Sequence, residues 1–126
     1  MGLSMTAYGR SGRKDWAYAY GTFSRVRRLL AEAAGLDDSI YRDMNKKTLY
    51  GLWHPDDRIK GDNLKYLLLH ADHEGILMPY TAKRIAKRIR KLLSENNFPV
   101  FDRQIIVEMA EVFEFSSKEW VVVTFG

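Results

Sequence analysis

The residues best suited to chemistry form one short run, HADHEG at positions 70–75. Imidazole nitrogens and carboxylate oxygens are common ligands of zinc and nickel. His70 and His73 have a His-x-x-His spacing, and His54 is the only other histidine of the sequence. A catalytic metal would need His54 brought to this run by the fold. A metal-dependent enzyme using His54, His70 and His73 is therefore kept as the weaker of two alternative functions.

The same run also invites comparison with a calcium-binding EF-hand loop. With Gly75 at the invariant glycine, His70, Asp72 and Glu74 take the first, third and fifth ligand positions. The twelfth position, where calcium needs a bidentate glutamate, is then Thr81. We therefore predict no metal and no cofactor here. The pattern favours a structural loop, in which Asp72 caps the backbone and Gly75 adopts positive φ.

This loop belongs to a wider set of residues that carries a family resemblance. The set comprises Met1-Gly2-Leu3, the stretches 16–20 and 23–27, and His70, Asp72, Gly75, Leu77, Ile85 and Ala86. The chain resembles a family of small, functionally uncharacterised bacterial and phage proteins whose loop reads His-Ser-Asp-x-Asp-Gly-x-Leu. Here Ala71 replaces the Ser and Glu74 replaces the second Asp. The resemblance implies a setting, an accessory factor that could inhibit a host system, and no particular reaction.

A second candidate for function is a strongly basic segment within residues 81–95. Its apolar positions recur at helical spacing, so its charges fall on the remaining sides of a helix. The charged residues are Lys83, Arg84, Lys87, Arg88, Arg90 and Lys91. Such a helix could bind phosphates or an acidic partner. It could also be a solvated face partly neutralised by a glutamate stripe at positions 108, 111 and 114.

Basic residues elsewhere could extend this surface. Arg10 and Arg13 lie in the segment GRSGRK at residues 9–14, and Arg25 and Arg28 lie further along the chain. They contribute only if the fold brings them to the same side as the basic helix. GRSGRK itself lacks the glycine spacing and the following helix of a phosphate-binding Walker loop, so we interpret it as a hairpin turn.

The sequence offers no catalytic set. It contains no cysteine, and no Ser-His-Asp arrangement is evident. The aromatic row Trp16, Tyr18 and Tyr20 falls on one face of a strand, where it is either core or a platform for stacking bases. We favour the core and assign no catalytic residue.

The expected elements make an α+β fold, a small antiparallel sheet packed against four or five helices. The sheet joins an N-terminal hairpin (strands 2–8 and 15–20) to a C-terminal strand at 120–125, which we expect to be covered on both faces. Helices are expected at 22–34, capped by Thr22 or Ser24, at 62–71, at 81–95, capped by Thr81, and at 103–115, capped by Asp102. A short helix from Asp37 to Met44 begins an otherwise loop-rich stretch at 37–60. The helix at 103–115 rests on the three-residue spacing of its glutamates, which overrides the strand propensity of Ile105, Ile106 and Val107.

Size and charge complete the sequence-based expectation. The chain has 126 residues and a net charge of +4, and no linker rich in Pro, Gly or Ser marks a domain boundary. We therefore predict a single domain, residues 1–126. No apolar run could span a bilayer, which together with the absent cysteines favours the cytoplasm and argues against a membrane partner. We expect a non-enzymatic accessory protein that binds a protein or nucleoprotein partner. Direct nucleic-acid binding through the basic helix 81–95 is the first alternative.

Overall fold

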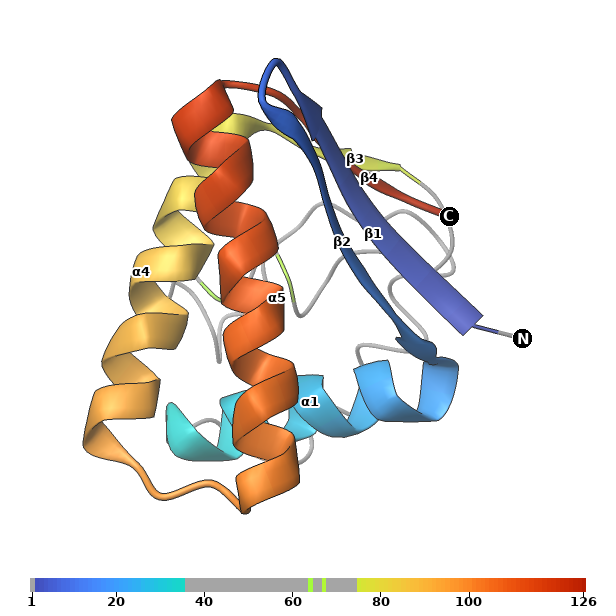
Figure 1. Cartoon of the computed structure of the whole chain (residues 1–126). Helices are drawn as coiled ribbons and strands as arrows, with labels where there is room; N and C mark the ends of the chain where they lie inside the picture. The colour runs from blue at the N-terminus through green and yellow to red at the C-terminus, as the bar shows by residue number, and fades with distance from the viewer. Residues whose placement is uncertain (1, 36–63, 65–66, 68–74) are drawn as a thin grey trace.

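A four-stranded antiparallel sheet and three helices make up the described part of the chain, which confirms the α+β class (Figure 1). The computed structural model describes residues 2–35, 64, 67 and 75–126. The elements in chain order are β1 (Gly2–Gly9), β2 (Gly12–Ala19), α1 (Tyr20–Ala33), β3 (Ile76–Leu77), α4 (Pro79–Glu95), α5 (Val100–Glu119) and β4 (Val123–Phe125).

The N-terminal hairpin has longer strands and a tighter turn than the sequence suggested. Only Arg10 and Ser11 separate the strands, and Gly9 pairs with Gly12, whose φ is 136°. The predicted loop at 9–14 is therefore wrong at its C-terminal end. Arg13 and Lys14 belong to β2 because each has a place on the sheet: Arg13 lies on the exposed face, and Lys14 reaches α5 from the opposite face.

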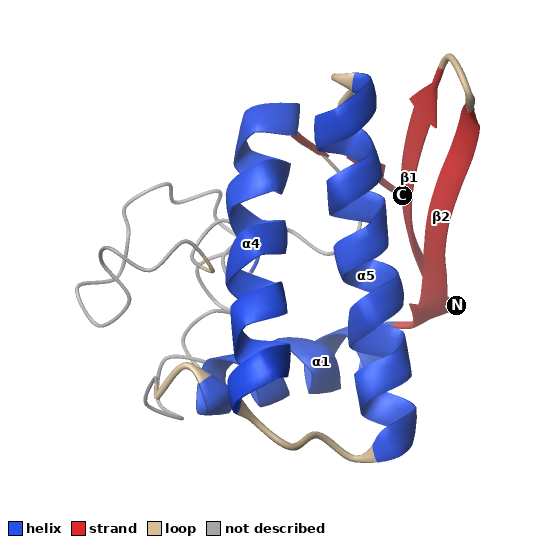
Figure 2. Ribbon diagram, turned by 60° about the vertical axis from the view of Figure 1, so that its left-hand side comes forward, coloured by secondary structure: helices blue, strands red, loops and turns tan. Residues whose placement is uncertain are grey.

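The sheet has the strand order β2-β1-β4-β3. The C-terminal strand β4 pairs with β1, with Met5 opposite Phe125, and β3 pairs with β4. Residues Val123 and Phe125 are buried and Thr124 is exposed, so β4 is covered on one face only. The expectation of cover on both faces is wrong because the helices pack on one side of the sheet (Figure 2).

Helices α4 and α5 form an antiparallel pair beside the sheet, and α1 crosses near the start of α5 (Figures 1 and 2). The glutamate-spacing argument for α5 is confirmed. This helix is longer than predicted at both ends, running from Val100 to Glu119. The helical spacing predicted for α4 is confirmed as well, with buried Ile85 and Ile89 among its core residues.

The side-chain caps predicted for these three helices are wrong. The N-cap residues are Ala19 for α1, Met78 for α4 and Pro99 for α5, and none of them makes a side-chain capping bond. Two of the helices begin next to proline, whose fixed φ suits a helix start without a cap. Asp102 instead lies buried in the first turn of α5, where it accepts a hydrogen bond of 2.8 Å from Arg25. After α1, Gly35 has a φ of 75°, the left-handed conformation that glycine commonly adopts at a helix end.

The core lies between the sheet and the helices. Trp16 is 1% exposed, packs edge-on against Phe23, and donates from its indole nitrogen to the carbonyl of Ile105 at 3.0 Å. Trp16 therefore belongs to the core and cannot stack bases. Tyr18 is half-buried, and Tyr20 is the first residue of α1 rather than a member of β2.

Parts of the sequence-based expectation lie outside the described residues. These are the short helix from Asp37 to Met44, most of the helix at 62–71, and the loop residues His70, Asp72, His73 and Glu74. Leu64 and Leu67 are described, and both are fully buried. No helix in the described ranges has the length and apolar character needed to cross a membrane.

Candidate functional site

A groove about 370 Å³ in volume lies between α4 and α5. The two helices run antiparallel, so that residues on the second and third turns of α4 face the last turns of α5. The groove is lined by Lys83, Ala86, Lys87 and Arg90 from α4 and by Glu114, Ser117 and Lys118 from α5. The two smallest of these side chains, Ala86 and Ser117, leave room between the longer ones.

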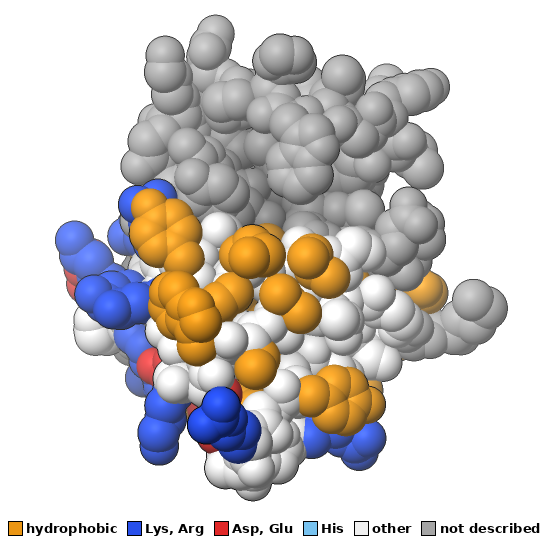
Figure 3. Space-filling view, turned by 90° about the horizontal axis from the view of Figure 1, so that it is seen from above, with side chains coloured by type: hydrophobic (Ala, Val, Ile, Leu, Met, Phe, Trp, Pro, Cys, Tyr) orange, Lys and Arg blue, Asp and Glu red, His pale blue; other side chains and the backbone are white. Residues whose placement is uncertain are grey.

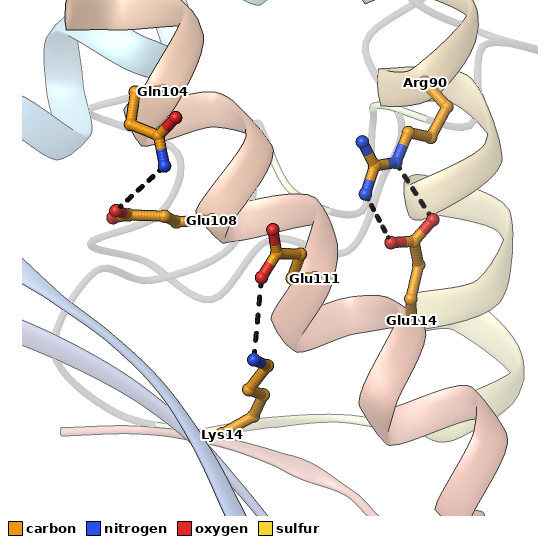
Figure 4. A network of polar contacts seen from close by, with 6 residues as sticks. All are labelled: Lys14, Arg90, Gln104, Glu108, Glu111 and Glu114. Atoms are coloured by element: carbon orange, nitrogen blue, oxygen red, sulfur yellow. Dashed lines mark hydrogen bonds and ion pairs between the residues drawn. The ribbon is translucent and has the colours of Figure 1, made fainter.

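One end of the groove already holds a carboxylate. Arg90 donates from Nη2 and Nε to the two carboxylate oxygens of Glu114, at 2.7 and 3.0 Å (Figure 4). This paired geometry is the one in which a guanidinium binds a carboxylate best. The hydrogen bond with Glu114 raises the pKa of Arg90. The contact joins α4 to α5, and the positive charge of Arg90 is paired with the negative charge of Glu114.

The other cations of the groove have no such partner. Lys83, Lys87 and Lys118 are exposed, and no acidic side chain of the described residues lies within ion-pair distance of them. Lys83 and Lys87 are one helical turn apart, which places their Cα atoms about 6 Å apart along the axis. Three lysines thus line a groove in which the one carboxylate of the lining, that of Glu114, is already paired with Arg90.

The six basic residues predicted on α4 therefore divide between two sides of the helix. Lys83, Lys87 and Arg90 follow the helical repeat on the side of α5 and line the groove. The remaining three lie on another side. Arg84 stacks on the ring of Tyr80, 4.1 Å from its centroid, and donates to its hydroxyl, while Lys91 lies 3.9 Å from Glu95. Arg88 is half-buried.

The basic residues that the sequence analysis singled out elsewhere in the chain, Arg10, Arg13, Arg25 and Arg28, do not line the groove. Arg13 lies on the exposed sheet face, paired with Asp15 at 2.8 Å and 5.9 Å from the ring centroid of Tyr8. Arg10 occupies the hairpin turn. That Arg25 and Arg28 could extend the basic surface of α4 stays a prediction. Both are held in ion pairs, Arg25 with Asp102 and Arg28 with Glu32.

The glutamate stripe of α5 does less to neutralise α4 than expected. Among its three members, Glu114 makes the ion pair with α4 that the described residues show. Glu111 pairs with Lys14 at 3.6 Å, and Glu108 accepts a hydrogen bond from Gln104 (Figure 4). Glu108 also accepts a hydrogen bond from Tyr18. Two of the three carboxylates thus bind side chains of β2, and one of these two also binds a side chain of α5 itself. The lysines of the groove remain unmatched for this reason.

The bond to Glu108 also changes the titration of Tyr18. Hydrogen bonding to this carboxylate, burial and the nearby negative charge together raise the pKa of Tyr18 to about 12. The tyrosine therefore stays protonated far above neutral pH, and the contact between β2 and α5 persists there.

The sequence alone did not identify Ser117 and Lys118 as site residues. Lys118 lies one turn after Glu114, so its place on the same side of a helix follows once α5 is known to continue past residue 115. Lys118 was missed because the helix was predicted to end at residue 115.

The loop candidates remain predictions, with one part confirmed. Gly75 has a φ of 99°, as the loop interpretation required, and its carbonyl accepts a hydrogen bond from the amide of Phe125 at 3.0 Å. His54, His70 and His73 lie outside the described residues. Within residues 2–35, 64, 67 and 75–126 no group of three or more His, Cys, Asp or Glu side chains could hold a metal ion.

Comparisons with known proteins do not assign this chain to a family. No protein-family model matches the sequence, and neither the curated proteins nor the solved structures contain a match. The groove must therefore be interpreted from its own chemistry.

Proposed function

We propose that this protein is a non-enzymatic binding protein whose α4–α5 groove docks an acidic segment of a partner protein. The observation that carries the proposal is the group of three exposed lysines, Lys83, Lys87 and Lys118, around a hollow with no free carboxylate. Cations held together without counter-charges attract acidic surfaces and speed association. The bacterial or phage setting and the cytoplasmic location remain part of this proposal, as expectations from the sequence.

The shape of the charged region favours a protein over a nucleic acid. The groove cations of α4 span only residues 83–90, about 10 Å of helix axis. Specific nucleic-acid binding through phosphates commonly uses about 6–10 contacts along a much longer track. The carboxylate of Glu114 also lies in the groove and would repel a continuous phosphate chain. A short acidic peptide segment, with its carboxylates spaced to match the lysines, fits better.

Binding of poly-L-glutamate, measured by calorimetry at low salt, tests the proposal. The double variant Lys83→Ala/Lys87→Ala should weaken binding about tenfold, since each lost contact contributes up to about 1 kcal/mol. The matched control is Arg10→Ala/Arg13→Ala, which removes the same charge from the hairpin and should bind almost like the wild type.

Two results would contradict the proposal. Equal losses in both double variants would mean that net charge, and not the groove, attracts the polyanion. Tighter binding to a single-stranded oligonucleotide of equal charge, lost in Lys83→Ala/Lys87→Ala, would support nucleic-acid binding through α4 instead.

A further inference from the structure

Trp120, directly after α5, has a backbone conformation that its side chain does not favour. Its φ of 57° and ψ of 50° are left-handed, and it is the one non-glycine residue with positive φ in the described part of the chain. At this position of a helix end glycine is usual, because a Cβ atom is crowded by the following carbonyl oxygen. The indole is nevertheless 66% exposed. A large side chain thus occupies a strained position without being buried.

The hydrogen bonds at this turn do not require an indole. The amide of Trp120 donates to the carbonyl of Ser116, and so does the amide of Val121, at 3.0 Å. The hydroxyl of Ser116 in turn donates to the carbonyl of Val121. The helix end is therefore held by Ser116 and by the backbone. Strain that stability does not explain is typical of functional positions.

Other exposed apolar side chains gather at the same end of the molecule. Because α4 and α5 are antiparallel, the start of α4 lies beside the end of α5. Ile76, Met78 and Tyr80 are 50%, 54% and 53% exposed. Figure 3 shows hydrophobic side chains clustered on the face seen from this end, with Lys and Arg side chains at the left and lower edges of the view. We call Ile76, Met78, Tyr80 and Trp120 the apolar face.

The apolar face lies beyond the end of the groove that is nearest to the start of α4 and the end of α5. Lys83 lies one helical turn after Tyr80 on α4, and Lys118 lies two residues before Trp120 on α5. The ring of Tyr80 is held by Arg84, which stacks on it. An apolar area that contains Trp and Tyr and has cations at its border is the arrangement found at binding hot spots, where a buried aromatic centre is surrounded by polar contacts.

We infer that Trp120 anchors the acidic partner segment of the proposed function. An apolar side chain of that segment packs on Trp120 and Tyr80, while neighbouring carboxylates bind Lys83 and Lys118. The partner is therefore an amphipathic acidic segment and not a uniformly charged one. This inference rests on the proposed function, because the groove supplies the charge complementarity that selects an acidic occupant.

Two synthetic peptides with equal numbers of glutamates test it. One carries leucines at helical spacing, the other carries serines at the same positions, and fluorescence anisotropy measures both affinities. The leucine peptide should bind about tenfold more tightly to the wild type, in keeping with one aromatic hot spot. In Trp120→Gly this advantage should disappear, while the affinity of the serine peptide stays the same. The thermal midpoint should stay unchanged or rise, since glycine suits the left-handed backbone.

The outcomes separate this inference from the proposed function. If the serine peptide binds and depends on Lys83 and Lys87, but leucines add nothing, the inference is wrong and the proposed function stands. If neither peptide binds, both are wrong. Should Trp120→Gly lower the thermal midpoint, Tyr80→Ser and Trp120→Asn replace it as variants, and retention of the full leucine advantage in both overturns the inference. Self-association of the wild type that Trp120→Gly abolishes would assign the face to a second copy of the chain instead.

Discussion

The side chain of Glu119 lies directly against the backbone of Gly9. A Cβ atom added to Gly9 would stand 2.7 Å from Cγ of Glu119, closer than real contacts allow. The hydroxyl of Ser11 donates to the carboxylate of the same glutamate. The hairpin turn is thereby joined to the end of α5, next to Lys118 and Trp120. Both candidate binding residues are therefore sequence neighbours of the residue that makes this contact.

Replacing Gly9 with alanine should destabilise the protein by about 1–2 kcal/mol, because the added methyl group displaces the Glu119 side chain. Chemical denaturation measures the loss. Gly21→Ala is the matched control: nothing lies within 4 Å of its added Cβ, and alanine in a helix gains up to about 1 kcal/mol. Equal stability of Gly9→Ala and wild type would contradict the close contact.

Trp16→Phe should cost about 1–3 kcal/mol of unfolding free energy. The change removes the 3.0 Å hydrogen bond to the Ile105 carbonyl and leaves space in a core where Trp16 is 1% exposed. Trp120→Phe makes the same chemical change at an exposed position and should stay within about 0.5 kcal/mol of the wild type. A loss of unfolding free energy in Trp16→Phe that is no larger than the loss in Trp120→Phe would contradict the role of Trp16 in joining β2 to α5.

Glu114→Gln should raise the affinity for poly-L-glutamate several-fold at low salt. The substitution removes the only carboxylate in the groove lining and releases Arg90 from its bidentate ion pair. Stability should fall by no more than about 1 kcal/mol, since both side chains are 43% exposed. Glu111→Gln removes the same charge beside β2 and serves as the control. A gain as large in Glu111→Gln would indicate that only net charge matters.

Stability should fall as the pH rises from 10 toward 12, in part through Tyr18, whose pKa is raised from 10.0 to about 12. Over this range the unfolded chain loses the tyrosine proton while the folded chain keeps it. Fewer protons are then bound in the unfolded state, and the free energy of unfolding decreases with pH. Tyr18→Phe should make this decline less steep. Denaturation midpoints at several pH values measure it, and identical slopes in the two proteins would contradict the bond to Glu108.

The sequence predicted the helices of this fold better than it predicted their ends. The i+3 spacing of Glu108, Glu111 and Glu114 correctly outweighed the strand propensity of Ile105 and its neighbours, because the apolar residues between them pack on the sheet. The caps were missed for a physical reason. A cap residue such as Thr81 or Asp102 signals where a helix can begin, but a proline two or three residues earlier already provides a start.

The candidate site was only half visible in the sequence. The basic residues of α4 were evident from composition and spacing. Lys118 and Lys83 line the same groove because α4 and α5 pack antiparallel. No local sequence pattern predicts this packing. Trp120 was expected in a strand because it begins the continuous apolar run at 120–125. Its exposure and conformation became apparent only in the folded chain.

The most direct test of the central claim is to map poly-L-glutamate binding by amide chemical shifts in the intact protein. If the α4–α5 groove is the binding site, the shifts that change on titration should belong to residues 83–90 and 114–118, and they should reverse as salt rises. Residues Arg10 and Arg13 should show little change. Perturbations centred on the hairpin, or spread evenly over all lysines and arginines, would contradict the groove as the site where this protein binds an acidic partner.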